Sequence, residues 1–306
     1  MKSVSIRRSP VAINAPNTAR LLPIAALITA ALLWGGSFSA MRLAVQAMNP
    51  WSVMWLRMTI ALIVILPFAG RLKKYPYQKG DWRLLVLMVL FQPCLYFLLE
   101  SYALKLTTSS QAGVISAFVP LMVAIGSWLM LAESLSTKTL AGLFLSVIGV
   151  VGLSLAGDSS KTAVAPLWGN TLELCAMTCA AVNMLIVKRL CGRYNPWLLT
   201  AFQVAAGTLF FTPGLFLLLR GTPVMWTTPL VFSIFFLGGL VTLGAFGLYN
   251  WAMSRIPASQ AAVFINMVPV AAVALGWIML GESLGVVQCI AAGGIIIGVA
   301  LSQKNA

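Results

Sequence analysis

Long apolar stretches alternate along this chain with short segments that carry charge, proline or glycine. About 20 consecutive apolar residues suffice to cross a bilayer as a helix. Open strands cannot satisfy their backbone groups in lipid, and barrel strands are shorter and alternate, so helices are expected. The pattern predicts an all-α polytopic membrane protein with ten transmembrane helices, at residues 21–46, 51–69, 82–104, 108–132, 138–156, 166–190, 196–219, 229–253, 257–280 and 285–303.

The second half of the chain repeats the first. Four features recur at an offset of 149 residues: Gln111 and Gln260, Pro120 and Pro269, Trp128 and Trp277, and Glu133-Ser134-Leu135 and Glu282-Ser283-Leu284. Further upstream, Asn49-Pro50-Trp51 recurs as Asn195-Pro196-Trp197, and Pro67 as Pro213, at an offset of 146. Each half therefore holds five predicted spans. An odd number of spans turns the second copy over, which predicts two inverted five-helix repeats at 21–156 and 166–303.

The composition agrees with a chain surrounded by lipid. It is 60% hydrophobic and 8% charged, with a mean hydropathy of +0.95, whereas a soluble domain has about 25% charged residues. The net charge of +14 could suggest nucleic-acid binding, but the charges fall in the short gaps and form no stripe along one surface. The expected partners are the lipid bilayer and a small-molecule substrate, and nucleic acid is excluded.

Lys and Arg predict the orientation. With a cytoplasmic N-terminus, 15 of the 20 Lys and Arg residues fall on the inner side, and cytoplasmic loops carry this excess. Both termini are therefore expected in the cytoplasm. Residues 1–20 are expected to form a cytoplasmic tail. A secretory signal would place its apolar core closer to the basic residues, and the composition weakly permits a transit peptide.

The chain lacks the usual machinery of enzymes. It has no histidine, no GxxxxGK[ST] and no GxSxG, and its aspartates, Asp81 and Asp158, lie in predicted loops. None of its five cysteines forms a CxxC. No catalytic residue, metal or cofactor is expected.

Several residues within the predicted spans are unusual there. Pro120 and Pro269 lie midway along spans four and nine, where each could act as a hinge or only as a structural kink. Arg57 in span two could pair with Glu100 or Glu173, line water, or reach outward to the interface.

Polar and aromatic side chains within the spans have two interpretations. The amides Gln92, Asn183, Gln203, Asn250 and Asn266 could bond neighbouring helices or face a pathway. The aromatics could wall a pocket or simply pack: Trp34, Phe38, Tyr96, Tyr102, Phe118, Tyr249 and Phe264.

The remaining features concern the ends of the spans and assembly. Glu133 and Glu282 end spans four and nine at opposite faces and are expected to cap or anchor the turn into the next helix. Gly294 and Gly298 form a GxxxG that permits close contact either within the bundle or between two copies, so monomer and homodimer both stay open.

Three segments give the chain a resemblance to a known family. LLWGGSFSAMRLA, WLRMTIA and YALKLTTSSQAGVISAFVPLMVAIGSWLMLAESLS, with the second copy of the last, resemble the EamA family of the drug/metabolite transporter superfamily. The resemblance implies two inverted five-helix repeats in a bacterial inner membrane. It also implies a central substrate cavity, at Trp34, Ser37, Tyr96, Ser116, Phe118, Asn183, Tyr249, Asn250, Phe264 and Asn266. Arg57 matches a family-typical arginine. Thr107-Thr108 corresponds to Ile256-Pro257, so the two turns are not expected to behave alike.

These observations lead to one expected function and several alternatives. We expect a secondary exporter of a small metabolite, such as an amino acid, in which the halves rock about spans four and nine. Few acids and no histidine disfavour an obvious proton relay, which leaves facilitated efflux or exchange as open as proton coupling. The alternatives are multidrug or toxic-compound efflux and a non-transporting membrane regulator. A membrane enzyme would need clustered acids or histidines.

Overall fold

The computed structural model describes residues 17–68, 70, 77–131, 137–156, 163–221, 223–255 and 264–303. It places helices in all ten segments that the apolar pattern predicts. The first half holds α1 (Asn17–Ala47), α2 (Pro50–Ile65), η1 (Leu66–Phe68), α4 (Trp82–Val89), η2 (Leu90–Leu95), α5 (Tyr96–Leu106), α6 (Ser109–Ile115), η3 (Ser116–Phe118), α7 (Val119–Leu131) and α8 (Thr137–Leu155). The second half holds α9 (Pro166–Leu190), α10 (Pro196–Phe210), α11 (Pro213–Arg220), α12 (Thr228–Phe235), η4 (Phe236–Ala245), α13 (Phe246–Met253), η5 (Phe264–Asn266), α15 (Met267–Leu280) and α16 (Val286–Gln303).

The repeated Asn-Pro-Trp sequence starts a helix in each half. Asn49 and Asn195 are N-cap residues whose side-chain oxygens accept from Trp51 N at 3.0 Å and Trp197 N at 2.9 Å. A proline follows each cap at the first helical position, where its missing N–H costs nothing.

Irregular turns interrupt the helices at matching places. The π-helical segments η2 and η4 overlap at the 149-residue offset, and the 3-10 turns η3 and η5 correspond to within one residue. At Gln92, inside η2, φ and ψ are −149° and 120°. This extended conformation is what the residue before a proline prefers, and Pro93 follows. Span three is therefore a broken helix.

The predicted number of spans is matched only in part by helix length. Within the described residues, five helices are long and apolar enough to cross a membrane, and α10 with α11, bent by 47°, gives a sixth if the pair is one span. The turn η3 divides segment four into α6 and α7, and the described part of segment nine, Phe264–Leu280, is also a shorter helix.

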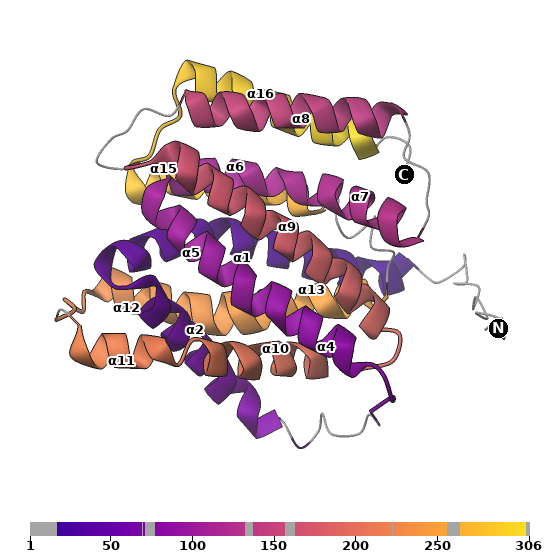
Figure 1. Ribbon diagram of the computed structural model, residues 1–306, viewed down its shortest axis with the longest axis vertical. Helices are drawn as coiled ribbons and strands as arrows, with labels where there is room; N and C mark the ends of the chain where they lie inside the picture. The colour runs from indigo at the N-terminus through magenta and orange to yellow at the C-terminus, as the bar shows by residue number, and fades with distance from the viewer. Residues whose placement is uncertain are drawn as a thin grey trace.

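The two halves interlock. The helices α8 and α16 lie side by side at one edge of the bundle, and α1 begins and α16 ends at the same end of it (Figure 1). Further pairings join the halves: α6 with α15, α2 with α10, α11 and η4, α10 with η2, α1 with η4, α13 and α15, and α9 with η2, α5 and α7. If each helix is replaced by its counterpart in the other half, the same set of pairings results.

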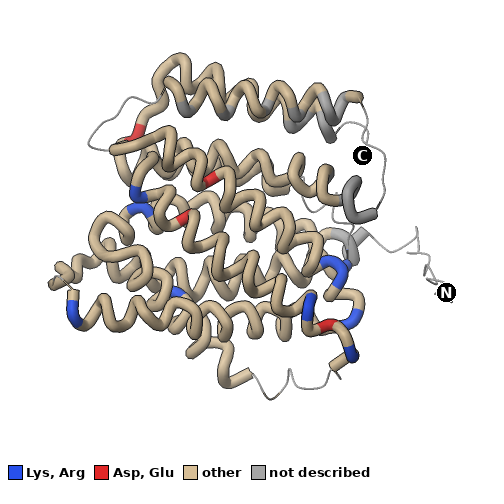
Figure 2. Tube along the Cα trace, viewed as in Figure 1, with Lys and Arg blue, Asp and Glu red and all other residues tan. Residues whose placement is uncertain are grey.

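Small residues bring the central helices close together. A Cβ placed on Gly113 of α6 would lie 2.1 Å from Ala272 Cβ of α15, and one on Gly35 of α1 would lie 2.3 Å from Ala271 Cβ. Such contacts are typical of helix packing in membranes. Lys and Arg gather mainly toward the two ends of the bundle (Figure 2).

Candidate functional site

A small cavity lies between the two halves. Its volume is about 40 Å³, and it is lined by Trp34, Ser37, Phe38, Gln92, Tyr96, Ser116, Val119, Met177, Ala180, Met184, Phe246, Ile265 and Val268. Four lining pairs occupy corresponding positions in the repeats: Trp34 with Ala180 and Phe38 with Met184 at an offset of 146, and Ser116 with Ile265 and Val119 with Val268 at 149. Both repeats therefore contribute equivalent surfaces to one site.

The cavity wall is apolar and aromatic, with a few polar groups. Ser37 Oγ donates to Trp34 O at 2.7 Å and Ser116 Oγ to Gly113 O at 2.6 Å, which leaves both hydroxyl oxygens able to accept. The indole N–H of Trp34 is buried and has no hydrogen-bond partner among the described residues. Such a wall suits a small organic solute, but ligand pockets are usually about 300–1,000 Å³. The cavity is therefore smaller in this conformation than a site that holds a ligand usually is.

An amide cluster forms one edge of the cavity at the break in span three. Asn183 Nδ2 donates to Gln92 Oε1 at 2.8 Å, and Gln203 Nε2 donates to Gln92 O at 3.1 Å and to Asn183 Oδ1 at 3.2 Å. The main-chain carbonyl of Gln92 thus gains a side-chain donor where regular helix geometry is lost. All three amides are buried.

The residues that the family resemblance points to occupy different places. Four of them line the cavity: Trp34, Ser37, Tyr96 and Ser116. Two lie in its second layer, since Asn183 bonds Gln92 and the Tyr249 ring lies 5.0 Å from that of Trp34. The others lie elsewhere: Asn250 donates to Thr200 Oγ1 at 3.0 Å, Phe118 and Phe264 pack with the hydrophobic core, and Asn266 ends η5.

The sequence reasoning did not single out Met177, Met184 and Phe246 as lining residues. Met177, Ala180 and Met184 follow each other at helical spacing along one face of α9. Phe246 corresponds to Phe97 at the 149-residue offset. Repeat alignment with Phe38 could have found Met184 and helical periodicity Met177, whereas Phe97 does not line the cavity and gives no such signal for Phe246.

Arg57 is buried and paired, so it does not reach the interface. Its Nε donates to Thr242 Oγ1 at 2.5 Å, and its guanidinium carbon lies 4.1 Å from the Phe97 ring centroid. Its Nη1 lies 3.9 Å from Glu100 Oε2, while Tyr96 OH donates to Glu100 Oε1 at 2.5 Å. Tyr96 thus links this charge cluster to the cavity.

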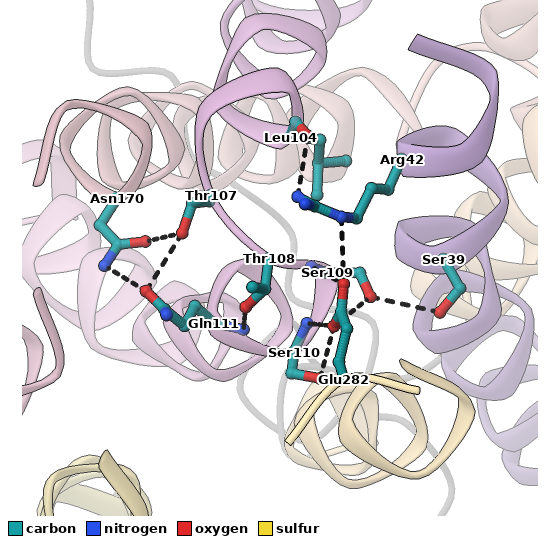
Figure 3. Close-up of polar contacts among 10 residues, drawn as sticks. All are labelled: Ser39, Arg42, Leu104, Thr107, Thr108, Ser109, Ser110, Gln111, Asn170 and Glu282. Carbon is teal, nitrogen blue, oxygen red and sulfur yellow. Dashed lines mark hydrogen bonds and ion pairs between the residues drawn. The ribbon is translucent and has the colours of Figure 1, made fainter. Parts of the chain in front are cut away.

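Glu282 connects the two halves at one end of the bundle, and we call its contacts the Glu282 cluster (Figure 3). Its Oε1 accepts from Ser109 N at 3.0 Å, and its Oε2 accepts from Ser110 N at 2.9 Å and from the Oγ atoms of both serines at 2.8 Å. Arg42 Nε lies 3.1 Å from Glu282 Oε1. Glu282 therefore caps α6 of the other half, where a carboxylate is favoured, and not the turn into α16.

A second polar group lies beside that cluster (Figure 3). Thr107 Oγ1 lies 2.8 Å from Asn170 Oδ1 and 3.1 Å from Gln111 Oε1, and Asn170 Nδ2 donates to Gln111 Oε1 at 3.0 Å. These contacts tie the start of α6 to the start of α9. The corresponding turn of the second repeat, Ile256-Pro257, and Glu133 lie outside the described residues.

The two prolines stand directly after the 3-10 turns. Pro120 is the second residue of α7, and Pro269 the third of α15. A proline has no N–H to bond the carbonyl four residues earlier, and that carbonyl belongs to Ser116 in η3 for Pro120 and to Ile265 in η5 for Pro269. The irregularity of spans four and nine therefore lies in η3 and η5, just before the prolines.

Comparison with known proteins agrees with this architecture. The uncharacterized transporter YetK of Bacillus subtilis (strain 168) is 27% identical over 279 residues, which cover 89% of this chain and 84% of that protein. A probable terminal-alkyne amino-acid exporter of Streptantibioticus cattleyicolor is 22% identical over 260 residues, 84% of this chain and 85% of that protein. One solved crystal structure shares the fold, with a TM-score of 0.62 at 20% identity, over 94% of this chain and 96% of that chain.

The sequence profile of the EamA-like transporter family matches both halves, at residues 21–155 and 167–303. The resemblance seen in the sequence is thereby confirmed. The chain is a multi-pass membrane transporter, not an enzyme, and it belongs to the EamA-like transporter family.

Proposed function

We propose that this protein is a secondary exporter of a small metabolite of the amino-acid class, acting by alternating access in a bacterial inner membrane. Its ten helical segments would all span the bilayer, as two inverted repeats with both termini in the cytoplasm. The observation that carries the proposal is the central cavity, because corresponding positions of both repeats line it. In transporters built from inverted repeats, the substrate site lies at the repeat interface.

The chemistry of the cavity supports the substrate class. Aromatic and thioether walls suit an apolar side chain. The Trp34 indole N–H can donate to a carboxylate, and the Ser37 and Ser116 oxygens can accept from an ammonium group. The relative from Streptantibioticus cattleyicolor is a probable terminal-alkyne amino-acid exporter, which favours the amino-acid class here as well.

The Glu282 cluster would form the outer gate. With cytoplasmic termini, the last two turns of α1 and the start of α6 lie toward the outer side, and Arg42, Ser109 and Ser110 are found there. The buried contacts of Glu282 hold the two halves together at that end. The conformation is therefore closed to the outside, and opening requires this cluster to separate.

A growth screen tests the proposal. Cells that express the protein are challenged with amino acids, amino-acid analogues and cationic toxins, and efflux of any protective hit is then measured in the same cells. We expect protection against an amino acid or analogue, lost in Trp34→Ala and kept in Gly293→Ala, whose new Cβ meets nothing within 4 Å. Protection only against cationic toxins would favour multidrug efflux, and no protection by any compound would favour a membrane regulator.

A further inference from the structure

Two buried carboxyl groups lie one helical turn beyond the cavity. On α9, Glu173 precedes the lining residue Met177 by four positions, and on α5, Glu100 follows the lining residue Tyr96 by four. Residues four apart share a helix face. The helices α5 and α9 pack directly together, and the two carboxyl groups are near enough to interact electrostatically.

The two carboxyl groups differ in their surroundings. Glu100 accepts from Tyr96 OH at 2.5 Å and has Arg57 Nη1 at 3.9 Å. Glu173 is fully buried, and neither of its carboxyl oxygens has a hydrogen-bond partner among the described residues. Arg57 thus pairs with Glu100, and no ion pair with Glu173 is found in the part of the chain that the structure describes.

Among the described residues, no hydrogen bond or ion pair gives Glu173 a counter-charge. On α5, Tyr96 and Glu100 are the titratable groups that act on it, and Arg57 of α2 pairs with Glu100. The segments α6, η3 and α7 carry no titratable side chain, and on α13 the Tyr249 hydroxyl faces Met184 S. The other elements that pack on α9 carry one such residue each: the exposed Arg83 of α4, which lies over the Trp82 ring, Cys94 of η2, and Lys138, the second residue of α8. An ionised carboxylate without a donor or cation costs several kcal/mol when buried, so such a group takes up a proton.

We propose that Glu173 is the proton-binding site that couples export to proton entry. This inference rests on the proposed transport function. In the conformation described here, Glu173 is neutral. A proton from outside water binds its carboxylate when the outer gate has opened and the solute has left. The same proton passes to cytoplasmic water after the cavity turns inward, and the carboxylate is then ionised again.

Polar groups line a route from Glu173 to the outer gate. Asn170 lies three residues before Glu173 on α9 and bonds Gln111 at the start of α6. Next to Gln111, Ser109 and Ser110 donate to Glu282. Separation of the Glu282 cluster would therefore bring outside water within two helical turns of Glu173.

Infrared difference spectroscopy of the purified protein in lipid tests the site without any substrate. The chain has only six acidic residues, so the carbonyl stretching band of a protonated carboxyl group can be assigned. At neutral pH we expect this band in the wild type and in Asp81→Asn, whose carboxylate pairs with Arg193. We expect it to vanish in Glu173→Gln. A band that persists in that variant, or a wild type without one, overturns the proposal.

Thermal unfolding gives a second test that does not depend on the spectrum. Glutamine resembles a neutral glutamic acid, so Glu173→Gln should melt no lower than the wild type. Glu100→Gln should melt clearly lower, because it leaves Arg57 buried without its carboxylate. Equal losses in the two variants would mean that Glu173 is ionised and paired, contrary to the proposal.

Transport of phenylalanine in proteoliposomes separates this inference from the proposed function. If the wild type exchanges phenylalanine and a pH gradient accelerates the exchange, Glu173→Gln should keep the exchange and lose the acceleration. Exchange that no pH gradient affects would overturn proton coupling while leaving the transport function in place. If phenylalanine does not move at all, the failure concerns this substrate, and the infrared band decides the proton site.

Discussion

Arg42 and Lys188 make the same contact in opposite halves of the molecule. They occupy corresponding positions at the 146-residue offset. Arg42 Nη1 donates to Leu104 O at 3.2 Å, and Lys188 Nζ donates to Met253 O at 2.6 Å. Leu104 and Met253 themselves correspond at the 149-residue offset. In the first half, a cation near the end of α1 thus bonds the end of α5. In the second half, a cation near the end of α9 bonds the end of α13 in the same way.

This correspondence predicts opposite effects of two substitutions. Arg42→Ala should loosen the outer end and Lys188→Ala the inner end, if the halves are inverted. The measurement is labelling of Ser37→Cys in the cavity by a membrane-impermeant maleimide, in a background without the five native cysteines. We expect labelling from outside to rise several-fold with Arg42→Ala, and labelling from inside to rise with Lys188→Ala. A rise on the same side for both variants would contradict the inverted arrangement.

Gly276 makes room for the Glu282 cluster, which predicts the effect of a single methyl group. A Cβ at Gly276 would lie 2.5 Å from Ser110 Oγ and 2.8 Å from Glu282 Oε2. Gly276→Ala should therefore force the cluster apart and lower the unfolding free energy by about 1–3 kcal/mol. Thermal unfolding in detergent checks this, with Gly293→Ala as the matched helical control. Equal melting temperatures for the two variants would show that the Glu282 cluster tolerates the extra volume.

Removing Arg57 should harm the protein more than removing its whole ion pair. Arg57→Met leaves Glu100 buried beside Tyr96 without its cation, and breaking a buried pair in this way costs about 3–5 kcal/mol. In the double variant Arg57→Met with Glu100→Gln no buried charge is left unpaired, so part of this loss should return. A double-mutant cycle on thermal unfolding measures the coupling. Additive effects of the two changes would argue against a stabilising interaction between these side chains.

The sequence predicted the helical segments well, because apolar stretches and their breakers are local. The offsets between repeats also revealed which positions correspond. Contacts between distant segments could not be predicted: Glu282 caps a helix that begins 173 residues earlier in the chain. A glutamate at a helix end suggests a local cap, and nothing in the flanking residues indicates a partner in the other half.

The wall of the cavity was predictable only where the helices are regular. On α1 and α9 the lining residues follow helical spacing, as with Trp34 and Phe38. The 3-10 turn η3 has fewer residues per turn than an α-helix, so its side chains point in other directions than α-helical spacing predicts. Ser116 lines the cavity, while Phe118 packs into the core. Gln92 marks the break in span three, yet an amide before a proline could equally serve packing.

Cys191 should react slowly with thiol reagents at neutral pH. It lies just beyond α9, where burial raises the pKa of its thiol to about 11, and nearby Lys188 only partly offsets this. Its thiolate fraction at pH 7 is then roughly two orders of magnitude below that of an ordinary cysteine of pKa about 8.5. Maleimide labelling should accelerate with pH up to about 11. The control is Gly192→Cys in a Cys191→Ser background, which should react at the rate of an ordinary cysteine. Equal labelling rates at positions 191 and 192 would contradict the raised pKa of the Cys191 thiol.

The 3-10 turns before Pro120 and Pro269 are the expected pivots of the rocking motion. The turn η3 joins α6 to α7, η5 leads into α15, and each proline lies in the first turn of the helix that follows. Replacement of both prolines by alanine would let a continuous α-helix form through the turn. Transport should then slow several-fold, while insertion into the membrane stays normal. Efflux of the screened substrate from proteoliposomes measures the rate, with Pro67→Ala, outside the two turns, as the control. Unchanged efflux in the double variant would remove both prolines from the mechanism.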